Sequence, residues 1–152
     1  TPIPGGDTAA DATSQPFTLY RFMTPPSTIL SDPSIAFAGM ITTISTPLCA
    51  SLQALWITAY LSSSLSQIPS SASDARETAL LHSRFGRWRY PCGYGGRFPD
   101  FVFDAVPYLD MLLKDLGLEY RRKGGWIKEV FEAYGPEDYA GIVEEWMDKK
   151  NM

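Results

Sequence analysis

Cysteine, histidine and basic residues are all scarce in this sequence. Its two cysteines, Cys49 and Cys92, are too few for a disulfide scaffold and lack the spacing of metal ligands, and the single histidine argues against a histidine-rich metal site. The 13 basic residues are outnumbered by 17 acidic ones, and the net charge of −4 argues against nucleic-acid binding through bulk positive charge. With 45% apolar and 20% charged residues, the 152-residue chain has the composition of one globular domain.

Charged residues are also scarce in the first half of the chain. Residues 1–73 carry only Asp7, Asp11, Arg21 and Asp32, and all the other charged residues lie in 74–152. This contrast predicts a buried first half and a solvated, helix-bearing second half. The cysteine usage and the lack of a leader-like apolar segment at the start predict a cytoplasmic protein.

Strands and one helix are expected before the middle of the chain. The loosely alternating residues 17–23 predict a short strand, and the apolar run 35–41 predicts a buried strand. Thr46 as N-cap and Pro47 as first helical residue then open a helix that continues, with apolar residues at three- and four-residue steps, to about Leu61. This helix is shorter than the roughly 20 residues that cross a membrane, so no transmembrane segment is expected.

The rest of the chain predicts linkers and helices. Proline, glycine and alanine in 1–16 predict a flexible lead-in, and seven serines in 62–73 predict a linker. The region 74–152 is predicted to be mainly helical. Its expected elements are a helix at 74–84, a loop at 85–99, a helix that opens at Pro99-Asp100, breaks at Pro107 and ends before Gly117, and two short helices at 126–133 and 136–147.

The first candidate site is the strand, loop and helix from Ile35 to Leu61. A helix N-terminus offers unpaired amides and the positive end of the helix dipole, which together suit an anionic group. The small residues Thr42, Thr43, Ser45 and Thr46 would let a ligand approach closely. An ordinary capped helix packed on a sheet explains the same pattern, and spacing alone favours that interpretation.

The second candidate site is the run of arginines, aromatics and glycines at 84–98. Such a run can stack bases and hold phosphates, although its glycines lack the dinucleotide-binding spacing. A structural loop whose arginines pair with nearby acids is the favoured alternative, and an arginine that reaches an NADP-type phosphate is a third. Cys49, Cys92 and His82 are assigned no chemistry, and no Ser-His-Asp or metal constellation can be assembled.

Several stretches resemble a known family. The segment Ile35–Leu61, with Gln53-Ala54-Leu55-Trp56 in its helix, resembles the C-terminal part of flavin-containing monooxygenases. The run 81–104, together with the Asp-Leu-Gly-Leu, Tyr-Gly-Pro and Glu-Glu-Trp stretches at 115–118, 134–136 and 144–146, is similar to a narrower group of fungal monooxygenase-like proteins that bind FAD and NAD(P). The resemblance covers roughly residues 17–152.

This resemblance implies a fold and a role. It implies an α/β fragment, in which the short strands and capped helix of 17–61 complete an FAD-binding Rossmann-like domain and a mainly helical tail follows. Both dinucleotide fingerprints of the family are missing, so FAD and NADP would be held by upstream domains of a longer chain. FAD would be reduced by NADPH and, with oxygen, would oxygenate a small-molecule substrate.

The resemblance also implies site residues. Thr43, Thr46, Pro47 and Leu48 would lie at the flavin, with the helix N-terminus facing its pyrimidine edge, whereas Gln53 and Trp56 would pack. The chain would be inactive alone, with no metal and no nucleic-acid partner. The alternative is a non-catalytic helical module that uses the 84–98 loop to bind a protein.

Overall fold

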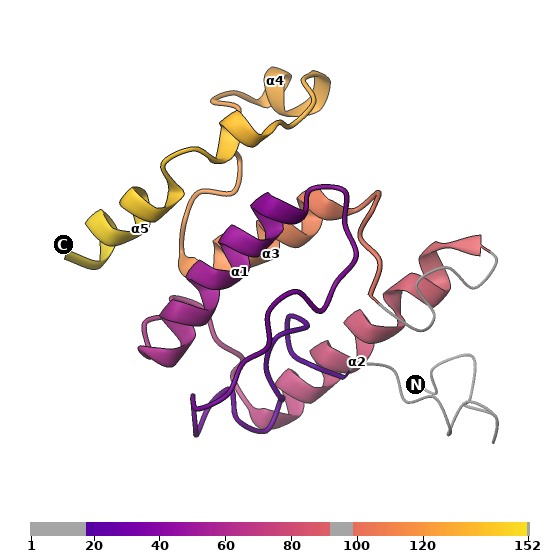
Figure 1. Cartoon of the computed structure of the whole chain (residues 1–152), viewed down its shortest axis with the longest axis vertical. Helices are drawn as coiled ribbons and strands as arrows, with labels where there is room; N and C mark the ends of the chain where they lie inside the picture. The colour runs from indigo at the N-terminus through magenta and orange to yellow at the C-terminus, as the bar shows by residue number, and fades with distance from the viewer. Residues whose placement is uncertain (1–17, 92–98, 152) are drawn as a thin grey trace.

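The computed structural model describes residues 18–91 and 99–151, and its regular elements are all helical. In chain order they are α1 (Thr46–Leu61), α2 (Ala72–Arg89), α3 (Ala105–Leu116), α4 (Trp126–Phe131), the 3-10 helix η2 (Pro136–Tyr139) and α5 (Ile142–Asn151). Figure 1 shows α1 and α3 side by side at the centre, with α2 and the loops of residues 18–45 on one side and the last three helices on the other.

The core forms where α1 and α3 meet. Both helices place apolar residues at three- and four-residue steps, so each has one continuous apolar face. Trp56 of α1 and Tyr108 of α3 are completely buried, and Leu112 and Leu116 of α3 continue the contact. The predicted helix at 46–61 is therefore confirmed, with Ser45 rather than Thr46 at the N-cap position.

The predicted α/β fold class is wrong, because the described residues contain no β-strand. Residues 20–24 form a tight turn, in which Tyr20 and Thr24 exchange backbone hydrogen bonds and Arg21 and Phe22 adopt positive φ angles of 52° and 59°. This turn buries Tyr20, Phe22 and Met23 together, although in a strand alternate side chains would point to opposite faces. The apolar residues Tyr20, Phe22 and Met23 are thus buried by a turn and not by a strand.

The predicted buried strand at 35–41 is also wrong. A strand is stabilised by a neighbour with which it forms a ladder, and the described residues supply none beyond single bridges at Tyr20–Thr24 and Thr42–Asp100. The amide of Phe37 donates instead to the carbonyl of Met23 (2.8 Å), and the amide of Gly39 to the side chain of Gln53 (2.9 Å). Phe37 remains 41% exposed, so the segment lies on the surface of the helical core.

Helix boundaries in the second half differ from the predictions in both directions. The helix expected at 74–84 runs from Ala72 to Arg89, so the first part of the expected 85–99 loop is helical. Pro107 does not break α3, because it lies in the first turn, where a missing amide removes no intrahelical hydrogen bond. Gly117 ends α3 in the left-handed conformation, as predicted.

The serine-rich segment has no regular structure in 62–71 but is tied to the core. The amides of Ser66 and Gln67 both donate to the carbonyl of Asp115, and the Ser66 hydroxyl donates to the carbonyl of Leu116. These bonds satisfy carbonyls at the C-terminus of α3, which have no partners within the helix. The segment therefore covers the end of a helix. The expected lead-in at 1–16 lies outside the described residues.

Candidate functional site

The four predicted cofactor-binding residues lie at the N-terminus of α1. Thr46 and Pro47 are exposed there, and Thr43 and Leu48 are half-buried. The threonine hydroxyls are used locally: the Thr43 hydroxyl accepts from the amide of Ser45 (3.2 Å), and the Thr46 hydroxyl donates to the Thr43 carbonyl (2.8 Å). No side chain caps the helix, so its first-turn amides can still donate to a ligand.

A cavity of about 260 Å³ opens beside this helix terminus, and we call it the α1 cavity. Pro47 and Leu48 line it, whereas Thr43 and Thr46 do not. Its other walls come from the first half of α3 and from the turn that leads into η2, two regions that lie far from α1 in sequence. The complete lining consists of Ile44, Ser45, Pro47, Leu48, Ala105, Val106, Leu109, Tyr134, Gly135, Pro136 and Tyr139.

Two tyrosines supply the polar chemistry next to the α1 cavity. The hydroxyl of Tyr139 is buried without a hydrogen-bond partner among the described residues, and burial together with the charge of Asp110 raises its pKa. The Tyr134 hydroxyl donates to Glu129 and accepts from the amide of Arg122, and burial and Glu129 raise its pKa to about 12. Both phenols are therefore neutral at physiological pH, where they can donate hydrogen bonds but cannot act as bases.

A second cavity, the aromatic cavity, lies on the other side of α3 and measures about 240 Å³. Its α3 residues are Pro107, Tyr108 and Met111, and the α1 cavity takes Ala105, Val106 and Leu109. Three- and four-residue steps keep each set on its own face of the helix. It is lined by Phe22, His82, Phe85, Phe101, Asp104, Pro107, Tyr108 and Met111. No sequence pattern places Phe22 beside His82, because 59 residues separate them and Phe22 lies in a turn of unusual backbone conformation.

Burial and the nearby guanidinium of Arg21 lower the pKa of His82 to about 4. The imidazole is therefore neutral at physiological pH. Its Nδ1 is buried and has no hydrogen-bond partner among the described residues. The sequence analysis assigned His82 no chemistry because a histidine after two leucines on a helix carries no signal beyond packing.

The motif residues Gln53 and Trp56 build the fold, as the sequence predicted. Gln53 donates to the Tyr108 hydroxyl (2.7 Å) and accepts the amide of Gly39, so it joins α1 to α3 and to the 35–41 segment. The indole of Trp56 donates to Asp115 (2.9 Å), a carboxylate only 2% exposed. Arg21 donates to the same carboxylate through two nitrogens, at 2.8 and 2.9 Å, which ties the 20–24 turn to α3.

Only part of the arginine and aromatic run at 84–98 falls within the described residues. Residues 84–89 continue α2, and the hydroxyl of Tyr90 donates to Asp104 at the mouth of the aromatic cavity. The Arg89 guanidinium lies 3.7 Å from the same carboxylate, in line with the predicted pairing of arginines with nearby acids. Residues 92–98, which include Cys92, lie outside the described part.

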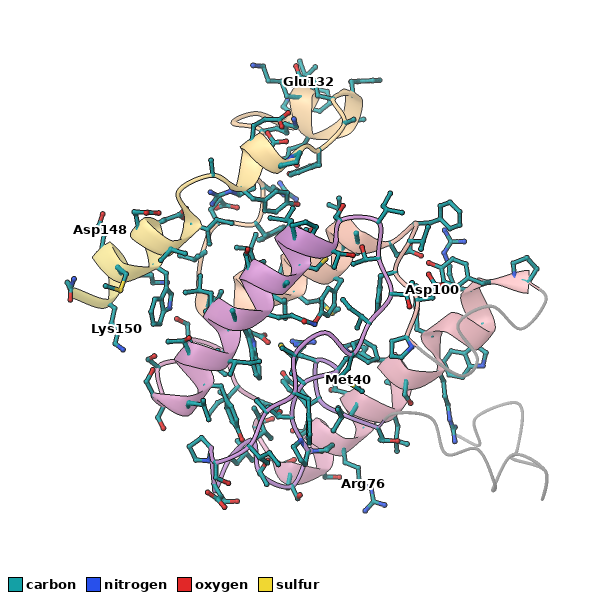
Figure 2. The ribbon with its side chains drawn as sticks, viewed as in Figure 1. Met40, Arg76, Asp100, Glu132, Asp148 and Lys150 are labelled. Atoms are coloured by element: carbon teal, nitrogen blue, oxygen red, sulfur yellow. The ribbon has the colours of Figure 1, made fainter. Side chains whose placement is uncertain are left out.

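Charged side chains lie on the outer surface of the molecule. Figure 2 shows Arg76 of α2 and Asp148 of α5 pointing away from the rest of the molecule. Among the described residues, no three His, Cys, Asp or Glu side chains are grouped closely enough to hold a metal ion. None of the helices that the structure describes is long and apolar enough to cross a membrane.

Comparison with known proteins identifies relatives of this chain. It is 40% identical over 130 residues to the FAD-dependent monooxygenase resA of Aspergillus sclerotiorum, a match that covers 85% of this chain and 22% of resA. It is 34% identical to DEP4 of Alternaria brassicicola and 36% identical to avaB of Aspergillus versicolor, both FAD-dependent monooxygenases, over 87% and 88% of this chain and 22% and 19% of those proteins.

The chain thus spans about a fifth of the length of the relatives that it matches. No protein-family profile matches it, and neither does any solved structure. The chain is therefore homologous to a part of fungal FAD-dependent monooxygenases, which confirms the resemblance seen in its sequence.

Proposed function

We propose that this chain works as the C-terminal portion of a longer FAD-dependent monooxygenase, in which it helps to close the flavin pocket, and that it is inactive alone. The observation that carries the proposal is the similarity of most of the chain to about a fifth of each relative. Proteins that differ at about 60% of aligned positions and still align over more than 80% of this chain share its fold throughout, so a common role is the simplest interpretation.

The described residues fit an edge of FAD and not the whole cofactor. The α1 cavity, at about 260 Å³, is below the size of pockets that enclose drug-sized ligands, and FAD is larger than those ligands. The described residues also contain no strand that could lead into a dinucleotide-binding turn. The remaining part of a longer chain would therefore hold the pyrophosphate and the adenine.

The contribution of this chain rests on α1. The amides of Thr46 and Leu48 and the positive end of the helix dipole would stabilise negative charge at the edge of a group held next to them. Pro47 and Leu48 would exclude water from that edge, and the neutral phenol of Tyr139, whose hydroxyl has no hydrogen-bond partner among the described residues, would donate a hydrogen bond to an acceptor there. FAD, when bound, would supply the oxidation chemistry. This role does not depend on a strand at 35–41, which the structure lacks.

The proposal also concerns the molecules and domains with which this chain would act. NADPH as reductant and a small-molecule substrate stay predictions that rest on the resemblance, and a cytoplasmic location stays a prediction that rests on the composition of the chain. The remaining domains of the same protein would contact α4, which has no buried residue. Its apolar side chains are each at least 57% exposed: Trp126, Ile127, Val130 and Phe131. Exposed apolar side chains in such density mark an interaction surface. The same observation favours the alternative function, a non-catalytic module that binds another protein.

A chimera tests the proposal. The segment of resA that aligns with this chain is replaced by residues 18–151, and flavin content is measured from the visible absorbance of the purified protein, with NADPH oxidation as a second readout. We expect about one FAD per chimera and loss of FAD when the segment is deleted. Full flavin content after deletion would contradict the proposed role and favour the interaction module.

A pair of variants in the chimera tests the site itself. Leu48→Glu places a carboxylate in the α1 cavity, where it would repel a negatively charged edge, and we expect reduced FAD retention. Ala50→Glu adds the same charge to the exposed side of the same helix and is expected to retain FAD. Equal flavin content in both variants would contradict the placement of the flavin at the α1 cavity.

A further inference from the structure

The aromatic cavity is enclosed by a continuous cluster of rings. Phe101 lies at its centre: its ring is 5.2 Å from that of Phe22, edge to face, and 5.0 Å from that of Tyr108, stacked. Phe85 stacks nearly parallel to Phe101 at 6.5 Å, and the His82 ring stacks on Phe22 at 6.3 Å. Both geometries are those that aromatic pairs prefer, so a further ring inside the cavity would find faces and edges to contact.

The volume of the cavity limits the size of its occupant. An apolar cavity of about 150 Å³ is known to hold benzene. At about 240 Å³, the aromatic cavity has room for one ring with substituents or for two fused rings. The flavin, with three fused rings and a dinucleotide, is too large, so this cavity is distinct from the proposed flavin contact at α1.

The polar groups of the cavity set the charge and the hydrogen bonding of the occupant. An anion would be repelled by the carboxylate of Asp104, which is 15% exposed. A cation would compete with Arg89 and with the hydroxyl of Tyr90, which already contact that carboxylate. Nδ1 of neutral His82 has no hydrogen-bond partner among the residues that the structure describes, and a buried polar atom without a hydrogen bond costs about 1–3 kcal/mol, which a donor on the ligand would recover.

We propose that the aromatic cavity binds a neutral aromatic molecule of one or two rings that carries a hydrogen-bond donor, such as an indole or a phenol, with the donor directed to Nδ1 of His82. The ring contacts supply affinity and the single donor supplies orientation. The proposal is independent of the flavin role, because it concerns a different face of α3 and can be tested without FAD.

Titration of the 152-residue chain with indole tests this binding. The probe of the cavity is the methyl resonance of Met111, followed by NMR and assigned with Met111→Leu; the four other methionines act as internal references. We expect a saturable shift of the Met111 methyl and small shifts elsewhere. Indene, which has the same shape but no N–H, is expected to bind about tenfold more weakly, the value of one hydrogen bond to a neutral acceptor.

Variants separate the two parts of the proposal. His82→Phe is expected to weaken indole about tenfold while leaving indene unchanged, since it removes only the acceptor. Met111→Trp fills the cavity and should abolish binding of both probes, whereas Leu81→Ala, on α2 but outside the cavity, should bind as the unaltered chain does.

Three results would overturn the proposal. One is the absence of a saturable Met111 shift, including the case in which that methyl lies at its unfolded position before any ligand is added. Another is equal affinity for indole and indene, which would indicate an apolar cavity without the donor contact. The third is binding that survives Met111→Trp, which would put the ligand elsewhere.

Discussion

The body of the protein, residues 18–118, and its C-terminal arm, residues 119–151, are stabilised in different ways. In the body, apolar faces of α1 and α3 bury one another, and polar groups such as Asp115 are buried with their partners. In the arm only Tyr139, Ile142 and Trp146 are buried, and α4 projects away with its apolar side chains exposed (Figure 1). The body thus depends on a shared buried core, whereas α4 of the arm has no buried residue.

Within the arm, ion pairs and hydrogen bonds join its segments to one another. Arg122 pairs with Glu145 at 2.8 Å and donates to the carbonyl of Asp138, and Lys123 pairs with Asp138 at 2.8 Å. Glu145 is 39% exposed, and a pair that water reaches contributes little stability. The two regions should therefore respond unequally to substitution, and the exposed apolar residues of α4 should contribute little to the stability of this chain.

The largest effect is expected at Asp115. Asp115→Ala leaves Arg21 buried without its counter-charge and removes the acceptor of Trp56, so we expect a loss of about 3–5 kcal/mol in the free energy of unfolding. In the arm, Glu145→Ala breaks an ion pair whose carboxylate is 39% exposed and should cost less than about 1 kcal/mol. Urea denaturation of both variants measures the difference, and equal losses would contradict the comparison.

The second-largest loss in the free energy of unfolding is expected at Gln53. Gln53→Ala leaves the amide of Gly39 and the hydroxyl of Tyr108 each without one partner, and we expect a loss of about 1–3 kcal/mol. Gln67→Ala is the matched control, because that side chain is exposed and its backbone amide bond is retained. A control loss as large as that of Gln53→Ala would show that the buried amide network is unimportant.

The pH dependence of stability tests the burial of His82. Its pKa is about 4 in the folded chain and about 6.5 when unfolded, so below pH 6.5 the unfolded state binds a proton that the folded state does not. Stability is complete above pH 6.5 and falls, by at most about 1.4 kcal/mol per pH unit, as the pH decreases toward 4. Because the chain has one histidine, His82→Phe should remove this slope between pH 6.5 and 5.

The smallest effect is expected on α4. Trp126→Ser or Phe131→Ser removes an apolar side chain that is 72% or 78% exposed, and the free energy of unfolding should change by less than about 0.5 kcal/mol. The same substitutions in the resA chimera should weaken its assembly if α4 contacts the remaining domains. A large loss in the isolated chain would mean that α4 packs against the body in solution.

Helices were predicted well where the sequence carries local signals for their ends and their apolar faces. Pro47 and the spacing from Leu48 to Tyr60 fixed α1, and Gly117 marked the end of α3. The predicted helix break at Pro107 was wrong, because the position of a proline within a helix, and not its presence, decides whether it disrupts hydrogen bonds. The cofactor-binding role of Thr43, Thr46, Pro47 and Leu48 stays a prediction; Pro47 and Leu48 line a cavity, and the tyrosines opposite them come from a turn about 90 residues away, which no local pattern could indicate.

By itself, the sequence determined the acidic composition, the helix from Thr46 to Leu61 and, through its motifs, the resemblance to fungal FAD-dependent monooxygenases, because each of these depends on residues close together in the chain, whereas its prediction of an α/β fold was wrong. Only the tertiary structure decided that 20–24 is a turn and that 35–41 is a surface segment without regular structure. A short apolar run is compatible with a strand or with either of these, and the choice depends on distant partners such as Gln53 and Asp115. Both cavities likewise exist only where residues far apart in the chain meet on opposite faces of α3.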